Sequence, residues 1–142
     1  MHERSATILI KAPHIAVWDA LTSPSQIERY FFGTKLTTDW LIDSPMTFRG
    51  DYQGKTYEDR GTVLTFDPPT GLSYSYWSSF SGTEDLPVTR LIIRYVLKDE
   101  DGDVKVTVTT SNCKTEEQAQ HSVENWGIVL GGLKDLLENG LG

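Results

Sequence analysis

The chain has 142 residues, of which 38% are hydrophobic and 23% are charged, and its net charge at pH 7 is −7. This length suits one domain with a hydrophobic core of its own. The acidic balance argues against nucleic acid or an anionic membrane surface as a partner, because both attract basic proteins. No stretch approaches the roughly 18 consecutive apolar residues that a membrane-spanning helix needs.

The N-terminus and the cysteine content bear on the cellular compartment. Residues 1–14 contain no long apolar run and no small-residue cleavage pattern, so they do not resemble a signal peptide. Cys113 is the only cysteine, which excludes an internal disulfide and favours a reducing compartment. We therefore expect a cytoplasmic protein.

The first third of the chain predicts a strand followed by two short helices. Residues 5–11 are rich in β-branched side chains, which are typical of a strand. Pro13 ends that strand, and residues 14–21 then carry apolar side chains at helical spacing. A Ser-Pro pair beginning at Ser23 opens the second helix, with Gln26 at the spacing of a capping box. Both helices are too short to be stable without tertiary packing.

Five further strands are predicted in the middle of the chain. They cover residues 45–51, 57–66, 72–77, 88–97 and 104–110, and turns rich in glycine, proline or acidic residues separate most of them. Residues 33–44 and 78–87 are expected to be loops. Apolar and polar side chains alternate along most of these strands, as in a sheet with one buried face. In the third of them, Tyr74 and Tyr76 lie on one face and Trp77 on the other.

The last predicted element is a long helix over residues 115–142. Thr115 and Gln118 have the spacing of a capping box at its start. Its apolar residues recur at steps of three and four and form one stripe, which must be buried against another element. Gly131 and Gly132 each cost roughly 1 kcal/mol relative to alanine inside a helix. We therefore expect a bend there, the close approach of a strand or ligand, or a tight contact with the sheet.

These elements together predict the fold class. Strands joined by short turns pair antiparallel, and helices gathered on one face of such a sheet define the α+β class. We predict a curved antiparallel β-sheet that wraps around the long C-terminal helix, with two short helices after the first strand.

Three segments resemble the activator of heat-shock-protein-90 ATPase homologue family. Residues 12–32 resemble its pattern of a proline, Trp18 on the first helix and a Ser-Pro pair before the second. Residues 61–77 resemble its glycine-led strand, Asp-Pro-Pro turn and strand ending in tryptophan. Residues 124–137 resemble its final helix, although Asn125 stands where we would expect glycine before the tryptophan. The family lies in the START-like superfamily of helix-grip proteins, with polyketide cyclases and birch-pollen-allergen-like proteins.

The resemblance implies a single START-like domain over residues 1–142, with a cavity between the sheet and the long helix. A ligand-binding cavity is mostly apolar and carries a few placed polar groups. The candidate ligand-binding residues are Phe48, Phe66, Tyr74, Tyr76, Trp77, Tyr95, Trp126 and Arg60. Our first hypothesis is that they hold a small hydrophobic or aromatic molecule, and the alternative is that these rings only fill the core.

Two other functions stay open. By analogy with the family, the protein would be a co-chaperone-like stimulator of an ATPase, with a chaperone as its partner. A homodimer could also form, through a strand edge or through an aromatic patch of Phe31, Phe32 and Trp40.

The second of the two other functions is that of a cyclase or dehydratase. In such an enzyme, cavity shape, ordered water and a positioned side chain act together. Its candidate residues are Tyr74, Tyr76, Tyr95 and Arg60.

No cofactor, metal or catalytic motif is expected. The three histidines, His2, His14 and His121, lack metal-ligand spacing, and Cys113 has no second cysteine beside it, so no zinc site is expected. Cys113 and His121 are the one conceivable nucleophile pair, and no third residue is identified to orient them. The sequence contains no phosphate-binding glycine loop and no G-x-S-x-G motif.

Overall fold

The structure, a computed structural model, describes residues 2–79 and 81–139, without the side chain of Tyr52. Its elements are β1 (His2–Ile10), α1 (His14–Thr22), α2 (Pro24–Tyr30), β2 (Lys35–Thr37), β3 (Pro45–Tyr52), β4 (Lys55–Asp67), β5 (Gly71–Trp77), the 3-10 helix η1 (Pro87–Thr89), β6 (Leu91–Glu100), β7 (Asp103–Cys113) and α3 (Glu116–Asn139). The seven strands form one sheet in the order β1-β7-β6-β5-β4-β3-β2, and every neighbouring pair is antiparallel. The predicted α+β class is confirmed.

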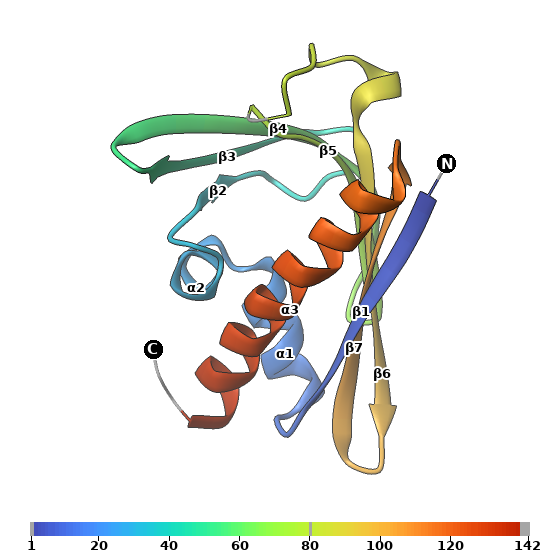
Figure 1. Ribbon diagram of the computed structural model, residues 1–142. Coiled ribbons are helices and arrows are strands. Elements are labelled where there is room, and N and C mark those ends of the chain that lie inside the picture. The colour runs from blue at the N-terminus through green and yellow to red at the C-terminus, as the bar shows by residue number, and fades with distance from the viewer. Residues whose placement is uncertain (1, 80, 140–142) are drawn as a thin grey trace.

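The sheet curves around the C-terminal helix. Figure 1 shows α3 crossing the concave side of the sheet, with α1 and α2 on that same side and the β3–β4 hairpin reaching over them. The arrangement follows from two matching patterns, because the alternating strands and the striped helix each need to bury one apolar face. The predicted helix-grip fold is therefore confirmed.

Strand β2 was not predicted and lies inside the expected loop of residues 33–44. It has only three residues, so it is too short to show an alternating pattern. Leu36 pairs with Phe48 of β3, which extends the sheet by one strand. The predicted strand over residues 88–97 also begins later than expected, because η1 occupies its first residues.

The predicted capping boxes have different outcomes. At the start of α3, Thr115 Oγ1 accepts a hydrogen bond from the backbone N–H of Gln118 at 3.0 Å. The Gln118 side chain returns to the N–H of Lys114 at 2.6 Å, one residue before the expected partner. At α2 the prediction was wrong, because Ser23 makes no side-chain cap and its hydroxyl instead bonds that of Ser25. The expected last residues of the long helix, 140–142, lie outside the described part of the chain.

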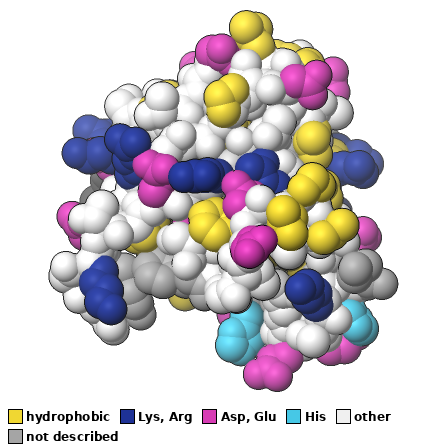
Figure 2. Space-filling model, turned by 90° about the horizontal axis from the view of Figure 1, so that it is seen from above, with side chains coloured by type: hydrophobic (Ala, Val, Ile, Leu, Met, Phe, Trp, Pro, Cys, Tyr) yellow, Lys and Arg dark blue, Asp and Glu magenta, His cyan; other side chains and the backbone are white. Residues whose placement is uncertain are grey.

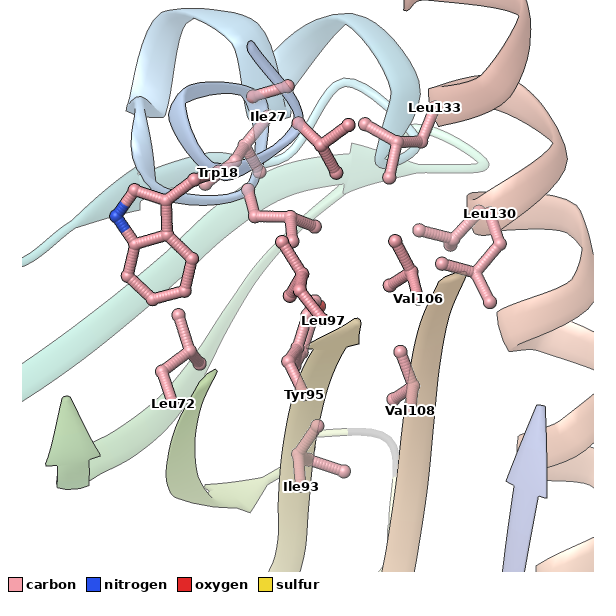
Figure 3. Close-up of a cluster of buried hydrophobic side chains, with 14 of the residues drawn as sticks. Trp18, Ile27, Leu72, Ile93, Tyr95, Leu97, Val106, Val108, Leu130 and Leu133 are labelled. Atoms are coloured by element: carbon pink, nitrogen blue, oxygen red, sulfur yellow. The ribbon is translucent and has the colours of Figure 1, made fainter. Parts of the chain in front are cut away.

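The core lies between the sheet, α1, α2 and α3. Figure 3 shows side chains from all of these elements converging, with Trp18 and Ile27 facing strand residues and Leu130 and Leu133 approaching from α3. Fully buried apolar side chains of this size each stabilise the fold by roughly 1.5–3 kcal/mol. None of the helices in the described ranges has both the length and the apolarity to cross a lipid bilayer.

The glycine pair in α3 marks a contact between helices. A Cβ atom on Gly132 would lie 3.3 Å from Cβ of Tyr30 in α2, whereas one on Gly131 would meet nothing within 4 Å. A close approach therefore exists at Gly132, but its partner is helix α2. The expected approach of a strand or ligand and the expected tight contact with the sheet were both wrong.

Candidate functional site

Five of the eight candidate residues form a continuous row of aromatic rings on the concave side of the sheet. In order of contact this row, which we call the ring chain, is Tyr76, Phe48, Tyr74, Tyr95 and Trp126. Successive ring centroids lie 5.2, 5.8, 6.2 and 5.6 Å apart. These separations fall in the range of favourable aromatic pairs.

The strand register and one hydrogen bond position the ring chain. Leu72 pairs with Tyr95, and Tyr74 lies two residues further along β5, so both tyrosines point to the concave face. Trp126 reaches this face from α3 and donates its Nε1 hydrogen to Thr110 Oγ1 at 3.0 Å. Burial raises the pKa of Tyr74 and of Tyr95 above the ordinary value, so both phenols stay protonated at neutral pH.

The other three candidates lie elsewhere. Phe66 contacts Trp18 and Trp40, at ring centroid distances of 5.5 and 5.4 Å. Trp77 is on the opposite face of β5, as its alternation predicts, and donates to the carbonyl of Thr83 at 3.1 Å. Arg60 pairs with Trp77 across the strands and therefore also points away from the ring chain. The structure thus does not bring Phe66, Trp77 and Arg60 together with the other five.

The outward face near Arg60 carries paired charges. Arg60 is 57% exposed and lies 3.5 Å from Glu58, which also binds Arg49 at 2.8 Å. Figure 2 looks down on the β3–β4 end of the molecule and shows Lys and Arg side chains alternating with Asp and Glu across its middle. Arg60 is therefore a member of a solvent-exposed ion-pair network rather than a neighbour of the candidate tyrosines.

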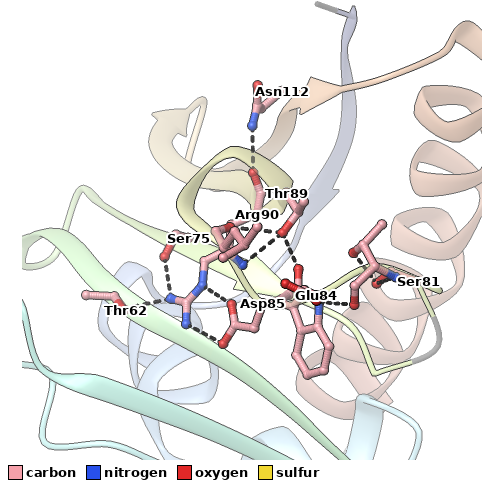
Figure 4. Close-up of polar contacts among 11 residues, drawn as sticks. Thr62, Ser75, Ser81, Glu84, Asp85, Thr89, Arg90 and Asn112 are labelled. Atoms are coloured by element: carbon pink, nitrogen blue, oxygen red, sulfur yellow. Dashed lines mark hydrogen bonds and ion pairs between the residues drawn. The ribbon is translucent and has the colours of Figure 1, made fainter.

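The loop between β5 and β6 is fastened to the same outward face. Arg90 forms a two-pronged ion pair with Asp85, at 2.7 and 3.0 Å, and lowers the pKa of that carboxyl group. The same guanidinium donates to Thr62 and Ser75 at 2.9 and 3.0 Å (Figure 4). Arg90 thus links Asp85 of this loop to the outward faces of β4 and β5.

A small cavity lies where the ring chain meets α2, β2 and Trp40. Its volume is about 20 Å³, enough for about one water molecule. Its lining includes Tyr30, Phe31, Leu36, Trp40, Phe48, Tyr74 and Tyr95. In this conformation the rings themselves occupy most of the space that the fold resemblance assigns to a cavity.

Helix α2, strand β2 and the side chain of Trp40 enclose this cavity, and we call them together the cover. Trp40 donates to the carbonyl of Thr22 at 2.8 Å, and Phe31 meets Trp126 edge to face at 5.6 Å. Phe32 is 58% exposed, whereas Phe31 and Trp40 are partly buried. The expected exposed patch of three aromatic residues is therefore reduced to Phe32.

A buried carboxylate stands at one end of the ring chain. Asp59 is only 5% exposed and accepts hydrogen bonds from the Tyr76 hydroxyl and from the backbone N–H and hydroxyl of Ser79, the latter two at 2.8 and 2.9 Å. Burial, and then the nearby Asp59 charge, raise the pKa of Tyr76 well above its ordinary value. Asp59 is not among the candidate residues predicted from the sequence, although its place two residues before Gly61 in an alternating strand puts it on the inward face.

A second and larger pocket of about 360 Å³ opens beside the start of α3. Its lining is mostly polar: Ser81, Thr83, Thr89, Leu91, Asn112, Lys114, Thr115, Glu117, Gln118 and His121. No sequence pattern indicated this pocket, because a loop, two strand ends and a helix build it together.

No nucleophile pair or metal centre forms in the described residues. Cys113 is fully buried, which raises the pKa of its thiol, and its hydrogen-bond partner is Ser122 rather than His121. Within residues 2–79 and 81–139, no three His, Cys, Asp or Glu side chains are grouped to hold a metal ion.

Comparison with known proteins gives the family. The model of the family described as Activator of Hsp90 ATPase homolog 1-like protein matches residues 11–138. A solved protein from Cytophaga hutchinsonii is 37% identical, with a TM-score of 0.84 and coverage of 99% of this chain and 97% of that one. No curated protein matches the sequence.

Two more distant structures share the fold. One is described as the Aha1 dimer from Colwellia psychrerythraea, with 21% identity, a TM-score of 0.76 and full coverage of both chains. The other is DynU16, described as a putative protein in the dynemicin biosynthetic locus, with 19% identity, a TM-score of 0.79 and coverage of 97% of this chain and 48% of that one. Because the family model spans most of the sequence and a relative above 30% identity spans nearly all of it, this chain belongs to the Activator of Hsp90 ATPase homolog 1-like protein family.

Proposed function

We propose that the chain, as a single START-like domain over residues 1–142, binds a small hydrophobic or aromatic molecule between the sheet and α3. The observation that carries this proposal is the ring chain, which lines one continuous face and borders the small cavity. Flat aromatic faces suit a flat apolar ligand, and the tyrosine hydroxyls and Asp59 supply the few polar groups that such sites use.

Binding requires the cover to move outward, since the cavity holds about one water molecule. The cover is built from short elements, with seven residues in α2 and three in β2. Helices and hairpins of this length have little stability of their own and open at low cost. A ligand that binds only the open form would then shift the population toward it.

The test is a thermal-shift titration with fatty acids, flavonoids and polyketide-like aromatic compounds, followed by tryptophan fluorescence. We expect at least one class to raise Tm and to quench the protein's fluorescence. The Trp126→Phe variant should lose part of that quenching, whereas Trp77→Phe should keep it, because Trp77 lies on the opposite face of the sheet. If no class changes Tm or the fluorescence, the binding proposal is wrong.

We propose as a second candidate that the protein stimulates a chaperone ATPase, and family membership is its support. The test measures ATP hydrolysis by the Hsp90-type chaperone of the same organism with and without this protein, together with a pull-down. Binding with a raised rate would favour this function, and unchanged rates would exclude it. Heat-denatured protein serves as the control.

We also propose that a homodimer forms in solution, since the Colwellia psychrerythraea structure is described as a dimer. The outer edge of β1 is partly occupied, because Lys134 of α3 donates to the carbonyl of Leu9 at 2.9 Å. The exposed ring of Phe32 is therefore the better candidate contact. Light scattering should show a mass of two chains for the native protein and one for Phe32→Ser, and a single-chain mass for both would refute the dimer.

A further inference from the structure

Asp59 is the one buried carboxylate among the described residues whose burial is known. It forms no ion pair with any described Lys, Arg or His side chain. Buried charges are normally paired, because their removal from water is unfavourable. A carboxylate that is buried without a cation is therefore a candidate for binding a ligand group.

The two oxygens of Asp59 are used unequally. Oδ1 accepts two hydrogen bonds, from the N–H and the hydroxyl of Ser79. Oδ2 accepts one, from the Tyr76 hydroxyl. A carboxylate oxygen has two acceptor positions, so Oδ2 retains one that no described residue fills.

Asp59 itself lies at the end of the ring chain, which forms the proposed ligand site. Asp59 pairs with Phe48 across β3 and β4, so both side chains are on the concave face. Tyr76 donates to Asp59 and at the same time meets Phe48 edge to face, with ring centroids 5.2 Å apart. If a flat aromatic molecule stacked on the ring of Phe48, the substituents at the edge of that molecule would face the carboxylate of Asp59.

We propose that the ligand is a neutral hydroxyaromatic molecule whose hydroxyl group donates to Asp59, and that Asp59 excludes aromatic carboxylates. This inference rests on the proposed binding function. A hydroxyl group fills the open acceptor position, whereas an ether of the same ring has no hydrogen to donate. A second carboxylate would face a like charge in a desolvated site, which disfavours its binding.

Asp59 also has a structural task, since its bonds to Ser79 fasten the start of the β5–β6 loop. The two roles make different predictions. If Asp59 only holds the loop in place, ligand selectivity should depend on Ser79, and the functional group of the ligand should not affect its affinity. Ligand recognition depends on the charge of Asp59 and changes the order of affinities among otherwise equal ligands.

The experiment measures Kd by tryptophan fluorescence for three probes with one ring system: 2-naphthol, 2-methoxynaphthalene and 2-naphthoate. For the wild-type protein we expect 2-naphthol to bind roughly tenfold more tightly than either of the others, the usual value of one buried hydrogen bond. Asp59→Asn keeps the shape of the side chain and removes its charge, so it should bring the Kd of 2-naphthoate to within about threefold of that of 2-naphthol. Tyr76→Phe should keep the rejection of 2-naphthoate, and the matched control Ser79→Ala should keep the full wild-type order.

The outcomes separate the two proposals. If none of the three probes binds, both the binding function in this site and the inference fail. If all three bind with equal Kd, or if Asp59→Asn keeps the wild-type order, the inference is wrong while the binding function stands. If Ser79→Ala abolishes the preference as fully as Asp59→Asn does, the fastened loop and not the carboxylate determines selectivity, and the inference is also wrong.

Discussion

Trp126 and Thr110 join the long helix α3 to strand β7 through one buried hydrogen bond, with Nε1 and Oγ1 3.0 Å apart. Thr110→Val keeps the size of the side chain and leaves the indole N–H without its partner. We expect the free energy of unfolding to fall by about 1–3 kcal/mol, the cost of an unsatisfied buried donor. Urea denaturation measures the change.

A double-mutant cycle shows whether this loss belongs to the pair. Trp126→Phe should cost less in the Thr110→Val background than in the wild type, because the bond is already absent. The matched control is Thr107→Val, whose hydroxyl makes only a long contact of 3.3 Å with Thr7. Equal losses for the two threonine variants would show that the bond to Trp126 contributes little.

His14 makes stability depend on pH. Its Nδ1 lies 2.7 Å from a carboxylate oxygen of Asp99, and its Nε2 lies 2.6 Å from the carbonyl oxygen of Pro69. Only the imidazolium form donates from both nitrogens, so first Asp99 and then the carbonyl group raise the pKa of His14 above 6.5. The stability it contributes is therefore complete below pH 6.5 and is lost as the pH rises through the raised pKa.

Urea denaturation of the wild type at several pH values between 5.5 and 8.5 tests this expectation. The midpoint should fall toward the alkaline side, and His14→Gln should flatten that part of the curve. His121→Gln is the control, because His121 has no hydrogen bond with another described residue and lies on an exposed helix face. Parallel curves for wild type and His14→Gln would contradict the assignment.

The two glycines of α3 should respond in different ways to alanine. Gly131→Ala should raise the free energy of unfolding by about 1 kcal/mol, because alanine is the better helix former and its Cβ meets nothing within 4 Å. Gly132→Ala places a methyl group 3.3 Å from Cβ and 3.4 Å from the carbonyl oxygen of Tyr30. Since backbone atoms yield little, the second variant should show no gain. An equal gain in both variants, measured by thermal unfolding, would mean that α2 moves freely.

Arg90 and Arg60 provide a matched pair of arginines. Arg90→Lys replaces the planar guanidinium group that donates hydrogen bonds to Asp85, Thr62 and Ser75. Because an ammonium group cannot make all of these bonds at once, we expect the free energy of unfolding to fall by about 1–3 kcal/mol. Arg60→Lys alters only an exposed ion pair with Glu58, so its effect should stay below about 0.5 kcal/mol. Similar effects in guanidinium denaturation would show that the loop does not depend on Arg90.

Much of the site could be inferred from alternation along single strands. The periodicity of two placed Tyr74 and Tyr76 on one face and Trp77 on the other, and the structure agrees. The same rule applied to β4 would have placed Arg60 outside and Asp59 inside. Arg60 was named as a candidate from its residue type alone, without its position in the alternation, and its side chain lies on the outward face.

The main helices and six of the seven strands, the antiparallel α+β class, the family resemblance and the start of α3 could all be predicted from the sequence, because they depend on spacing among residues close together in the chain. Which rings touch, how small the inner cavity is and where the larger pocket opens became clear only from the folded chain. Those features depend on strand register and on side chains from segments far apart in the sequence, such as Phe48 and Trp126 at the two ends of the row of rings from Phe48 to Trp126. Packing among such distant segments leaves no periodic pattern, so three-dimensional contact alone could reveal the acceptor position at Asp59.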